Sequence, residues 1–272
     1  MLETPVARQK VQLPRSPSWP PNDRPWHWRP FVEGERLLRI LARVTSDGGP
    51  EPAVARVCAL SVDLAGVTGA GIMLMPEDVP WGSLCTTDQV SATVEDLQFA
   101  LGEGPCLDAH LDDRPVLEPD LAAPARLRWP AFTAPAVEAG VRAVFGFPLQ
   151  LGAVRLGALN LYRDRPGPLS DDQHADTLML AGLAAHAVIL TQAGAPPGRL
   201  ADELAATADF HIVVHQASGM VSVQLGVDVS EALVRLRAYA FGHELVLRDV
   251  AHDVVARRLR FTDSGDQPET QP

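Results

Sequence analysis

The sequence is poor in lysine and cysteine, and it has no long apolar run. Lys10 is its single lysine, so nearly all of the positive charge is carried by arginine. The formal net charge is -11 at pH 7. A chain this acidic has no general affinity for nucleic acid or for membrane surfaces, so any contact with RNA has to be local.

The three cysteines, Cys58, Cys85 and Cys106, lie far apart and form no C-x-x-C pair. This spacing fits neither a structural zinc site nor a disulfide framework, and we expect no metal and no cofactor. No apolar run reaches the length of a membrane span, and the N-terminus lacks the apolar segment of a signal peptide. We therefore expect a cytoplasmic protein with no membrane partner.

A chain of 272 residues, 46% of them hydrophobic, can bury the cores of two modest domains. Proline content and apolar periodicity divide the chain. We predict a disordered proline-rich arm at 1–30, an α+β domain at 31–192, a linker at 193–203, a helical module at 204–261 and a disordered tail at 262–272. Pro196 and Pro197 in the linker exclude a continuous helix between the two domains.

The fold class of the first domain follows from the order of its elements. Helices are expected at 35–44, 53–64, 90–101, 129–139 and 171–191, and strands at 71–75, 82–86, 143–149 and 155–162. Region 102–130 is interpreted as irregular because glycine and proline punctuate it. Two pairs of neighbouring strands among helices indicate an α+β fold with an antiparallel sheet.

The segment 210–261 has the pattern of three short amphipathic helices and holds no group suited to covalent chemistry. Its last helix has an apolar stripe at Leu247, Val250, Ala251, Val254 and Val255. The middle helix opens with Asp228 followed three residues later by Glu231, a capping pair, and Gly226 ends the helix before it. Six arginines and five acidic residues leave the segment a net charge of +1. We expect a small all-α bundle that binds a partner.

The α+β domain resembles the GAF family. The resemblance is carried by 102–106 (GEGPC), 143–149 (AVFGFPL), 157–162 (GALNLY) and 169–170 (LS). It implies a sensor domain that encloses an unidentified small molecule between the sheet and the crossover at 102–130. The apolar stripe of the helix at 171–191 fits either a homodimer contact or packing on the sheet of its own domain.

The helical module resembles the ANTAR family of RNA-binding transcription antiterminators. The resemblance is carried by 216–220 (QASGM), 225–227 (LGV), 231–232 (EA), 236–237 (LR), Ala240, 247–251 (LRDVA) and 254–255 (VV). It implies a module that binds paired RNA hairpins and prevents terminator formation. By this resemblance the RNA-facing residues are Gln216, Ala217, Gly219, Arg237 and Tyr239, and the helix faces add Arg235, Arg248 and Arg257 as phosphate contacts. The family pattern often has lysine where this chain has Ser218.

Four polar residues of the crossover are candidates for a metal site. Glu103, Cys106, Asp108 and His110 lie close in sequence, but their spacing matches no standard zinc pattern. We interpret their polar groups as caps for backbone amides. The predicted helices also carry His174, His186, His211 and His215 without a second ligand at metal spacing, and we expect core or interface roles for these histidines.

Two other classes of function stay open. The near-neutral charge of the module and Ser218 fit a protein-interaction or dimerisation module that binds no RNA. Cys106 fits a thiol reductase of the kind that some GAF domains form, although that chemistry needs an attacking thiolate and a resolving partner within reach. We expect no enzyme activity, because the other cysteines fall on a predicted strand and a buried helix face.

Overall fold

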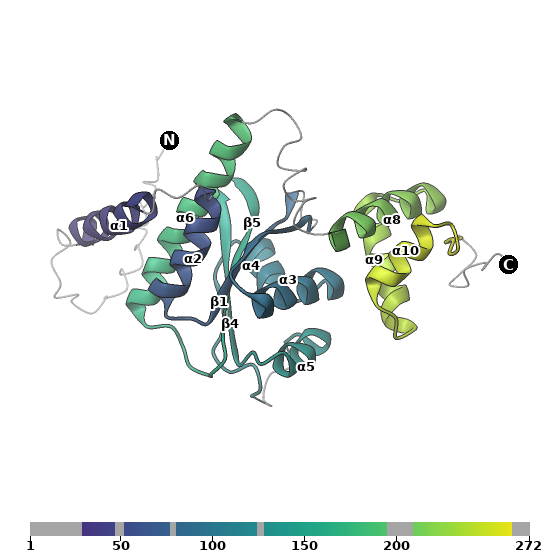
Figure 1. Cartoon of the computed structure of the whole chain (residues 1–272), viewed down its shortest axis with the longest axis horizontal. Coiled ribbons are helices and arrows are strands. Elements are labelled where there is room, and N and C mark those ends of the chain that lie inside the picture. The colour runs from purple at the N-terminus through teal and green to yellow at the C-terminus, as the bar shows by residue number, and fades with distance from the viewer. Residues whose placement is uncertain (1–28, 47–51, 77–79, 124–127, 195–208, 263–272) are drawn as a thin grey trace, which may run out of the picture.

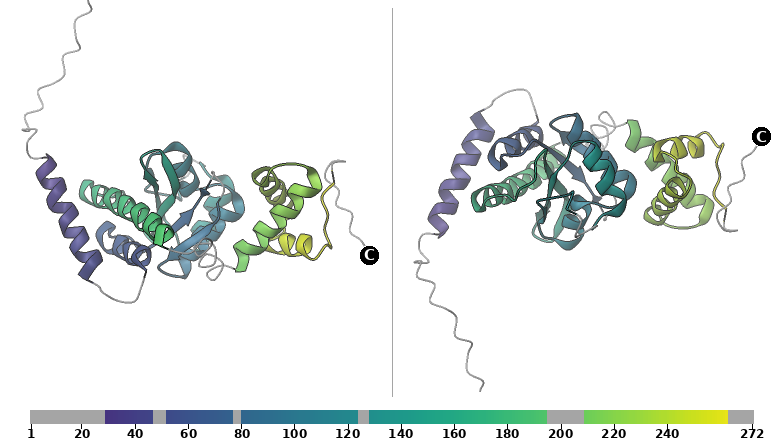
Figure 2. Two further views of the ribbon diagram at one scale, coloured as in Figure 1. Left: turned by 90° about the horizontal axis from the view of Figure 1, so that it is seen from above. Right: turned by 90° about the horizontal axis from the view of Figure 1, so that it is seen from below.

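The computed structural model describes residues 29–46, 52–76, 80–123, 128–194 and 209–262. In these residues a five-stranded sheet carries helices on both faces, and a bundle of three helices follows beside it (Figure 1). The two further views show the first helix and the C-terminal bundle on opposite sides of the sheet (Figure 2).

The sheet is antiparallel, with the strand order β2-β1-β5-β4-β3. Its strands are β1 (Gly69–Leu74), β2 (Gly82–Thr86), β3 (Val116–Glu118), β4 (Ala143–Leu151) and β5 (Val154–Arg163). A turn through Gly152, whose φ is 60°, joins β4 to β5. Pairing of β1 with β5 sets Gly71 opposite Asn160. This pairing brings side chains from distant parts of the sequence to the middle of the sheet.

Helices cover the sheet on each side. Helices α1 (Arg29–Ser46), α2 (Ala53–Ala65) and α6 (Asp171–Gly194) lie on one side, and α3 (Gln89–Leu101), α4 (Pro105–Asp112) and α5 (Pro130–Glu138) lie on the other (Figure 1). Local signals set the helix ends. The Asp88 carboxylate accepts a hydrogen bond from the Ser91 backbone nitrogen at 2.7 Å and caps α3. The helix ends at Gly102, whose φ of 68° is left-handed and free of steric cost for glycine.

Alternation along β4 divides its side chains between two cores. Phe145 and Phe147 are fully buried and pack with residues of α2 and α6. Val144 is buried on the opposite face, where it packs with Phe132 of α5. Each side chain of this size contributes about 1.5–3 kcal/mol when it is fully buried. The two layers therefore hold the sheet between its helices.

Helix α6 is long and apolar enough to cross a membrane by length and composition. The sequence-based statement that no run reaches this length is thus wrong for α6. Its apolar face is occupied within the fold, because Leu180, Ala184 and Val188 are buried in the core on the β4 side. Leu190, near the end of the helix, is 70% exposed.

The C-terminal bundle consists of α8 (Asp209–Leu225), α9 (Val229–Gly242) and α10 (Leu247–Val255). Its shared core contains Val214, Ala217, Val221, Leu233, Leu236, Val250, Ala251 and Val254. Gly226 follows α8 with a φ of 66°, and the Asp228 carboxylate caps α9 by accepting from the Glu231 backbone nitrogen at 2.8 Å. These two helix boundaries, the end of α8 and the start of α9, are the ones that the sequence predicts.

The structure confirms the predicted antiparallel sheet and its flanking helices. One of the predictions is wrong, because the crossover at 102–130 contains α4 and β3 and is not irregular throughout. Helix α1 begins at Arg29, next to the boundary predicted for the arm at 1–30. The rest of that arm, the linker from 195 to 203 with its two prolines, and nearly all of the tail lie outside the described residues.

Candidate functional site

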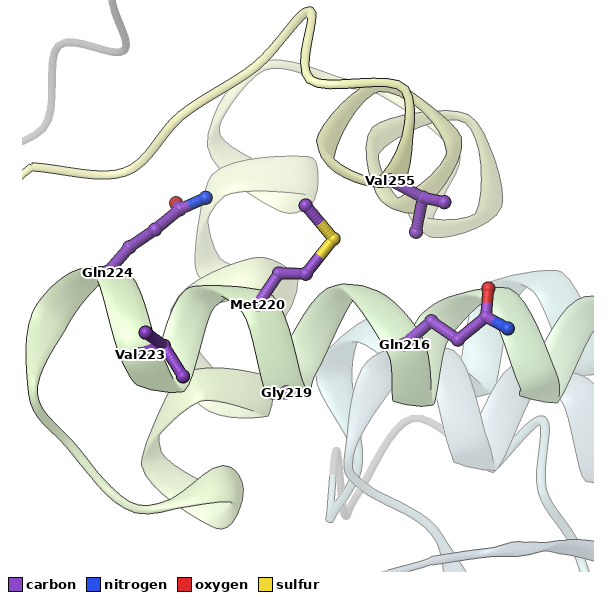
Figure 3. A pocket seen from close by; sticks show the side chains of 6 residues that line it. All are labelled: Gln216, Gly219, Met220, Val223, Gln224 and Val255. Carbon is purple, nitrogen blue, oxygen red and sulfur yellow. The ribbon is translucent and has the colours of Figure 1, made fainter.

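A groove runs between α8 and α10 of the C-terminal bundle (Figure 3). It is lined by Gln216, Gly219, Met220, Val223, Gln224 and Val255. Its volume of about 580 Å³ lies within the range of about 300 to 1,000 Å³ that is usual for small-molecule pockets. The α8 residues share one face because they recur at intervals of three and four. Figure 3 shows the Gln216 amide toward one end of the groove and the Gln224 amide toward the other.

An arginine-rich segment, residues 256–261, connects the two sides of this groove. We call it the arginine segment. It leaves α10 directly after Val255 and returns to α8, where the Phe261 backbone nitrogen donates to Gln224 Oε1 at 2.9 Å. It carries three exposed arginines, Arg257, Arg258 and Arg260. The groove is therefore apolar inside and basic along one rim.

The three arginines differ in their partners. Arg258 Nη2 lies 2.6 Å from Asp253 Oδ1. Among the described residues, no carboxylate lies within ion-pair distance of Arg257 or Arg260. Arg257 has a left-handed φ of 61°, which is uncommon outside glycine and directs this part of the segment away from the axis of α10. The two guanidinium groups of Arg257 and Arg260 are thus available to an anion.

The other predicted phosphate contacts lie on exposed helix faces. Arg235 Nε donates to Glu231 Oε1 at 2.7 Å, one turn away on α9. The Glu231 side chain therefore pairs with Arg235. The capping pair predicted from sequence would instead have the Glu231 side chain accept from a backbone nitrogen at the start of α9. Arg248 Nε is 3.9 Å from Asp249 Oδ1. Exposed pairs of this kind contribute about 0 to 1 kcal/mol, so both arginines can exchange their partners for a phosphate.

The predicted stacking residue Tyr239 is half-buried. Its ring stacks on His243, with a centroid distance of 4.1 Å and an interplanar angle of 30°. The edge of Phe261 approaches the same ring at 5.5 Å. Tyr239 therefore supports the end of the arginine segment, and only part of its ring surface is open.

Two of the predicted RNA-facing residues are not open to a partner in this conformation. Ala217 is fully buried in the core of the bundle. Arg237 reaches out of the bundle to α3, where its Nη2 donates to the Phe99 carbonyl oxygen at 2.5 Å and its guanidinium lies 5.7 Å from the Phe99 ring centroid. Burial lowers the pKa of Arg237 to about 10, so it stays protonated at neutral pH.

Two histidines of α8 extend this contact with the α+β domain. His215 Nε2 donates to the Trp81 carbonyl oxygen at 2.8 Å. His211 packs edge-on against Phe99 at 4.3 Å, and its Nε2 lies 3.4 Å from Asp96 Oδ1. Burial lowers the pKa of His211 to about 4, which leaves its ring neutral at pH 7. Together with Arg237, these residues form what we call the docking contact.

Two glycines give the docking contact its close approach. A Cβ on Gly82 would lie 2.9 Å from His211 Nδ1, and a Cβ on Gly102 would lie 2.9 Å from an Arg237 nitrogen. Both glycines also have positive φ, at 147° and 68°. The surface that receives the bundle is therefore shaped at the backbone level, because a larger residue would be strained and would crowd the incoming side chain.

A polar cluster lies inside the α+β domain, on the other face of the same helix α3. It consists of Ser83, Glu95, Gln98 and Asn160. Asn160 Nδ2 donates to Glu95 Oε1 at 2.7 Å, and burial raises the pKa of Glu95 to about 8. Among the described residues, Glu95 Oε2, Asn160 Oδ1, Gln98 Nε2 and Ser83 Oγ have no hydrogen-bond partner. Each such buried atom costs about 1–3 kcal/mol, so the cluster is suited to hold a small polar guest.

The cysteines are placed where thiols are unreactive. Cys106 and Cys58 are buried, and Cys85 lies on β2. Burial raises the pKa of Cys106 well above its usual range. The pKa of Cys85 is raised through its contact with the Cys58 thiol and through burial. A thiol rather than a thiolate is therefore present at each of these two positions at pH 7.

The polar crossover residues have structural partners. Glu103 Oε1 accepts from the backbone nitrogens of Ala131 and Phe132 at 2.5 and 2.8 Å, at the start of α5. Asp108 Oδ2 accepts from Trp129 Nε1 at 3.0 Å. This confirms the predicted capping role for Glu103. Within the described part of the chain, no group of three or more His, Cys, Asp or Glu side chains is arranged to hold a metal.

Sequence reasoning missed four of the six residues that line the groove. Met220 and Val255 carry part of the ANTAR resemblance and Val223 and Gln224 belong to a predicted helix, but none of the four was predicted as a site residue. One signal could have indicated Met220 and Gln224. They follow Gln216 at intervals of four residues, so all three lie on the same face of the predicted helix. The approach of Val255 depends on how α10 packs on α8, which no periodicity within one helix reports.

Comparisons with known proteins place the α+β domain in a family. A family model described as "GAF domain" matches residues 50–190. No curated protein matches the chain. Solved structures of similar fold include the GAF domain of a phosphoenolpyruvate-protein phosphotransferase from Coxiella burnetii, which is 16% identical with a TM-score of 0.44; the match covers 58% of this chain and 96% of that one.

Two further solved structures are similar at the same level. The GAF-B domain of DevS from Mycobacterium smegmatis is 20% identical with a TM-score of 0.39, over 53% of this chain and 96% of that one. Free methionine-R-sulfoxide reductase from Neisseria meningitidis, in complex with its substrate, is 15% identical with a TM-score of 0.41. The match covers 61% of this chain and 94% of that one. The family model covers just over half of the 272 residues, and the chain therefore belongs to the GAF domain family.

Proposed function

We propose that this chain is a cytoplasmic transcription antitermination regulator, in which a GAF sensor domain controls an ANTAR-type bundle that binds RNA hairpins. The observation that carries the proposal is the groove between α8 and α10 with its basic rim. Gln216 and Gly219, which the ANTAR resemblance assigns to RNA, line the groove. Arg257, which was predicted as a phosphate contact from the helix faces, follows the lining residue Val255 by two positions. No catalysis belongs to the proposed function.

The charge distribution supports local RNA binding rather than general affinity for nucleic acid. The whole chain has a net charge of -11, whereas the arginine segment holds three arginines and no acidic residue. Counterion release from a few phosphates gives modest affinity with a shallow dependence on salt. Sequence preference then has to come from bases in loops, which proteins read by stacking and by hydrogen bonds to exposed base edges.

The docking contact supports control by the GAF domain. In the conformation described here, α3 holds Arg237, which the resemblance assigns to RNA, and it also contributes Glu95 and Gln98 to the polar cluster. One rigid helix thus carries both an interior polar surface and the surface that receives the bundle. A small polar molecule at the cluster would bias the position of α3, and through it the release of Arg237.

The proposal is tested by sequencing RNA that is cross-linked to the tagged full chain in cells and purified with it. We expect enrichment of paired hairpins ahead of terminators. The comparison protein is the Arg257→Ala, Arg260→Ala double variant. Both substitutions lie outside the core of the bundle, and we expect this variant to lose the enrichment of hairpins. Equal RNA recovery from both proteins, or recovery without hairpins, would contradict RNA recognition by this module.

A protein-interaction or dimerisation module is the second candidate. The observation that favours it is the apolar exposure of the bundle, where Val223 is 85% exposed and Phe241 is 71% exposed. Exposed apolar groups of this kind occur at protein interfaces. Sedimentation of the full chain over a range of concentrations, with and without hairpin RNA, separates the candidates. A dimerisation module that binds no RNA would self-associate as the concentration rises, and hairpin RNA would leave its sedimentation unchanged.

A further inference from the structure

We infer that the groove between α8 and α10 is a slot for one unstacked nucleobase of an RNA loop, with the phosphate of that nucleotide on the arginine segment. The inference rests on the proposed RNA-binding function and adds where and how a base is held.

The walls of the groove suit a planar ring. Met220 and Val255 face each other across it, and Figure 3 shows the Met220 side chain directed toward α10. A thioether packs favourably against an aromatic ring, and apolar walls exclude water from both faces of the ring. Gly219 has no side chain and no heavy atom within 4 Å of its Cβ position, so the floor of the groove is open at this point.

The ends of the groove suit the edges of a base. Gln216 is exposed and offers a carbonyl acceptor and an amide donor side by side, the pair that a glutamine uses with a base edge. At the other end, Gln224 Oε1 accepts from the Phe261 backbone nitrogen, which leaves the amide nitrogen of Gln224 as the group that can donate to a base edge. A purely hydrocarbon occupant would leave both amides without a use.

The rim decides between a base and a hydrophobic peptide segment. Arg257 and Arg260 are exposed and lie on the six-residue segment that connects Val255 to Gln224, so the segment that begins and ends at the apolar slot carries two guanidinium groups. Outside the arginine segment, Arg235 and Arg248 each lie beside a carboxylate, and Arg237 is held by the Phe99 carbonyl oxygen. A ring that carries its own phosphate complements this combination of surfaces.

The test uses Gly219→Leu, which fills the slot. The position has open space around it and lies within α8, where leucine is a better helix former than glycine, so the variant keeps its fold. Gly182→Leu is the matched control, because it is another half-exposed helical glycine with nothing within 4 Å, located on α6. Thermal melting of both variants reports that the fold is retained.

Binding is measured by fluorescence polarisation with the full chain and two probes. One is a labelled hairpin RNA pool with a randomised loop, enriched on the wild-type chain, and the other is the same stem closed by an abasic loop. We expect Gly219→Leu to weaken binding of the first probe about tenfold or more, which is the loss of one stacked base. The second probe should bind wild type and Gly219→Leu equally, and Gly182→Leu should match wild type for both.

The outcomes separate this inference from the proposed function. If the wild type binds the hairpin and Gly219→Leu binds it equally well, the slot is refuted and RNA binding stands. If the wild type binds neither probe at any concentration, both the slot and the proposed function fail. If Gly219→Leu abolishes self-association in sedimentation while RNA binding is unchanged, the groove is an interface between copies, and the slot is likewise overturned.

Discussion

Arg237 of the bundle donates a hydrogen bond to the backbone carbonyl oxygen of Phe99 at 2.5 Å, across the boundary between the two domains. The same guanidinium lies over the Phe99 ring at 5.7 Å. Because Arg237 belongs to α9 and Phe99 to α3, these two contacts link the bundle to the GAF domain. The consequences of this link can be measured.

His215→Ala tests the docking contact. The substitution removes the hydrogen bond to Trp81 and leaves that carbonyl oxygen without its partner, at a cost of about 1–3 kcal/mol to the docked state. We expect faster hydrogen exchange in β2 and α3, and higher affinity for hairpin RNA because Arg237 is released more often. His186→Ala is the control, since His186 is an exposed helical histidine that bonds only its own helix, at Gly182. Unchanged exchange in both variants would argue against a docked pair.

Glu95→Gln tests the polar cluster through pH. The pKa of Glu95 is about 8 in the folded chain against 4.5 for the ordinary group. As the pH rises from 4.5 to about 8, the unfolded chain loses this proton while the folded chain keeps it, so the free energy of unfolding falls. Full expression of the shift gives an upper limit of about 5 kcal/mol.

Glutamine keeps a hydrogen-bonding group at this position and removes the titration. We therefore expect urea midpoints of Glu95→Gln to decline less than those of wild type over this pH interval. Glu138→Gln, an exposed position at the end of α5, should follow the wild-type profile. Parallel profiles for wild type and Glu95→Gln would show that Glu95 is ionised in the fold.

Salt dependence tests the arginine segment. Each phosphate neutralised on single-stranded nucleic acid changes the slope of log K against log salt by about 0.7. Arg257→Ala with Arg260→Ala should therefore reduce the slope by roughly 1.4 if each arginine holds one phosphate. Arg114→Ala, an exposed arginine of the GAF domain paired with Asp112, should leave the slope unchanged. A slope that the double variant does not alter would place the phosphates elsewhere.

Thiol labelling tests the thiol-reductase reading. Cys106 is fully buried and burial raises its pKa, so iodoacetamide should modify it far more slowly than a free thiol. Mass spectrometry of native and urea-unfolded protein gives the two rates for each cysteine. Rapid labelling of native Cys106 would support the thiol-reductase function. Slow labelling would argue against that function.

The sequence predicts elements better than it predicts relationships between them. The apolar stripe from Leu247 to Val255 and the cap at Asp228 are local, and both predictions match the structure. Helix α4 was missed because its start, Gly104 and Pro105, reads as a turn, although proline at the first helical position is favourable. A short helix with such a start has no periodicity long enough to reveal it.

The candidate site divides in the same way. Gln216 and Gly219 were assigned by the ANTAR resemblance and line the groove, and Arg257, predicted from its helix face, lies on the arginine segment. The contact of Arg237 with Phe99 could not be predicted, because the two residues are 138 positions apart in the chain. Helical and strand periodicities report only on neighbours within one element. Ala217 was assigned to RNA by resemblance, yet the packing of α8 on the other two helices buries it.

RNA binding at the groove and the arginine segment can be mapped by ultraviolet cross-linking of the full chain to hairpin RNA, followed by mass spectrometry of the cross-linked peptides. We predict cross-links concentrated within residues 216–224 and 255–261. Cross-links confined to the GAF domain, or none above the level given by an unrelated acidic protein, would contradict this prediction.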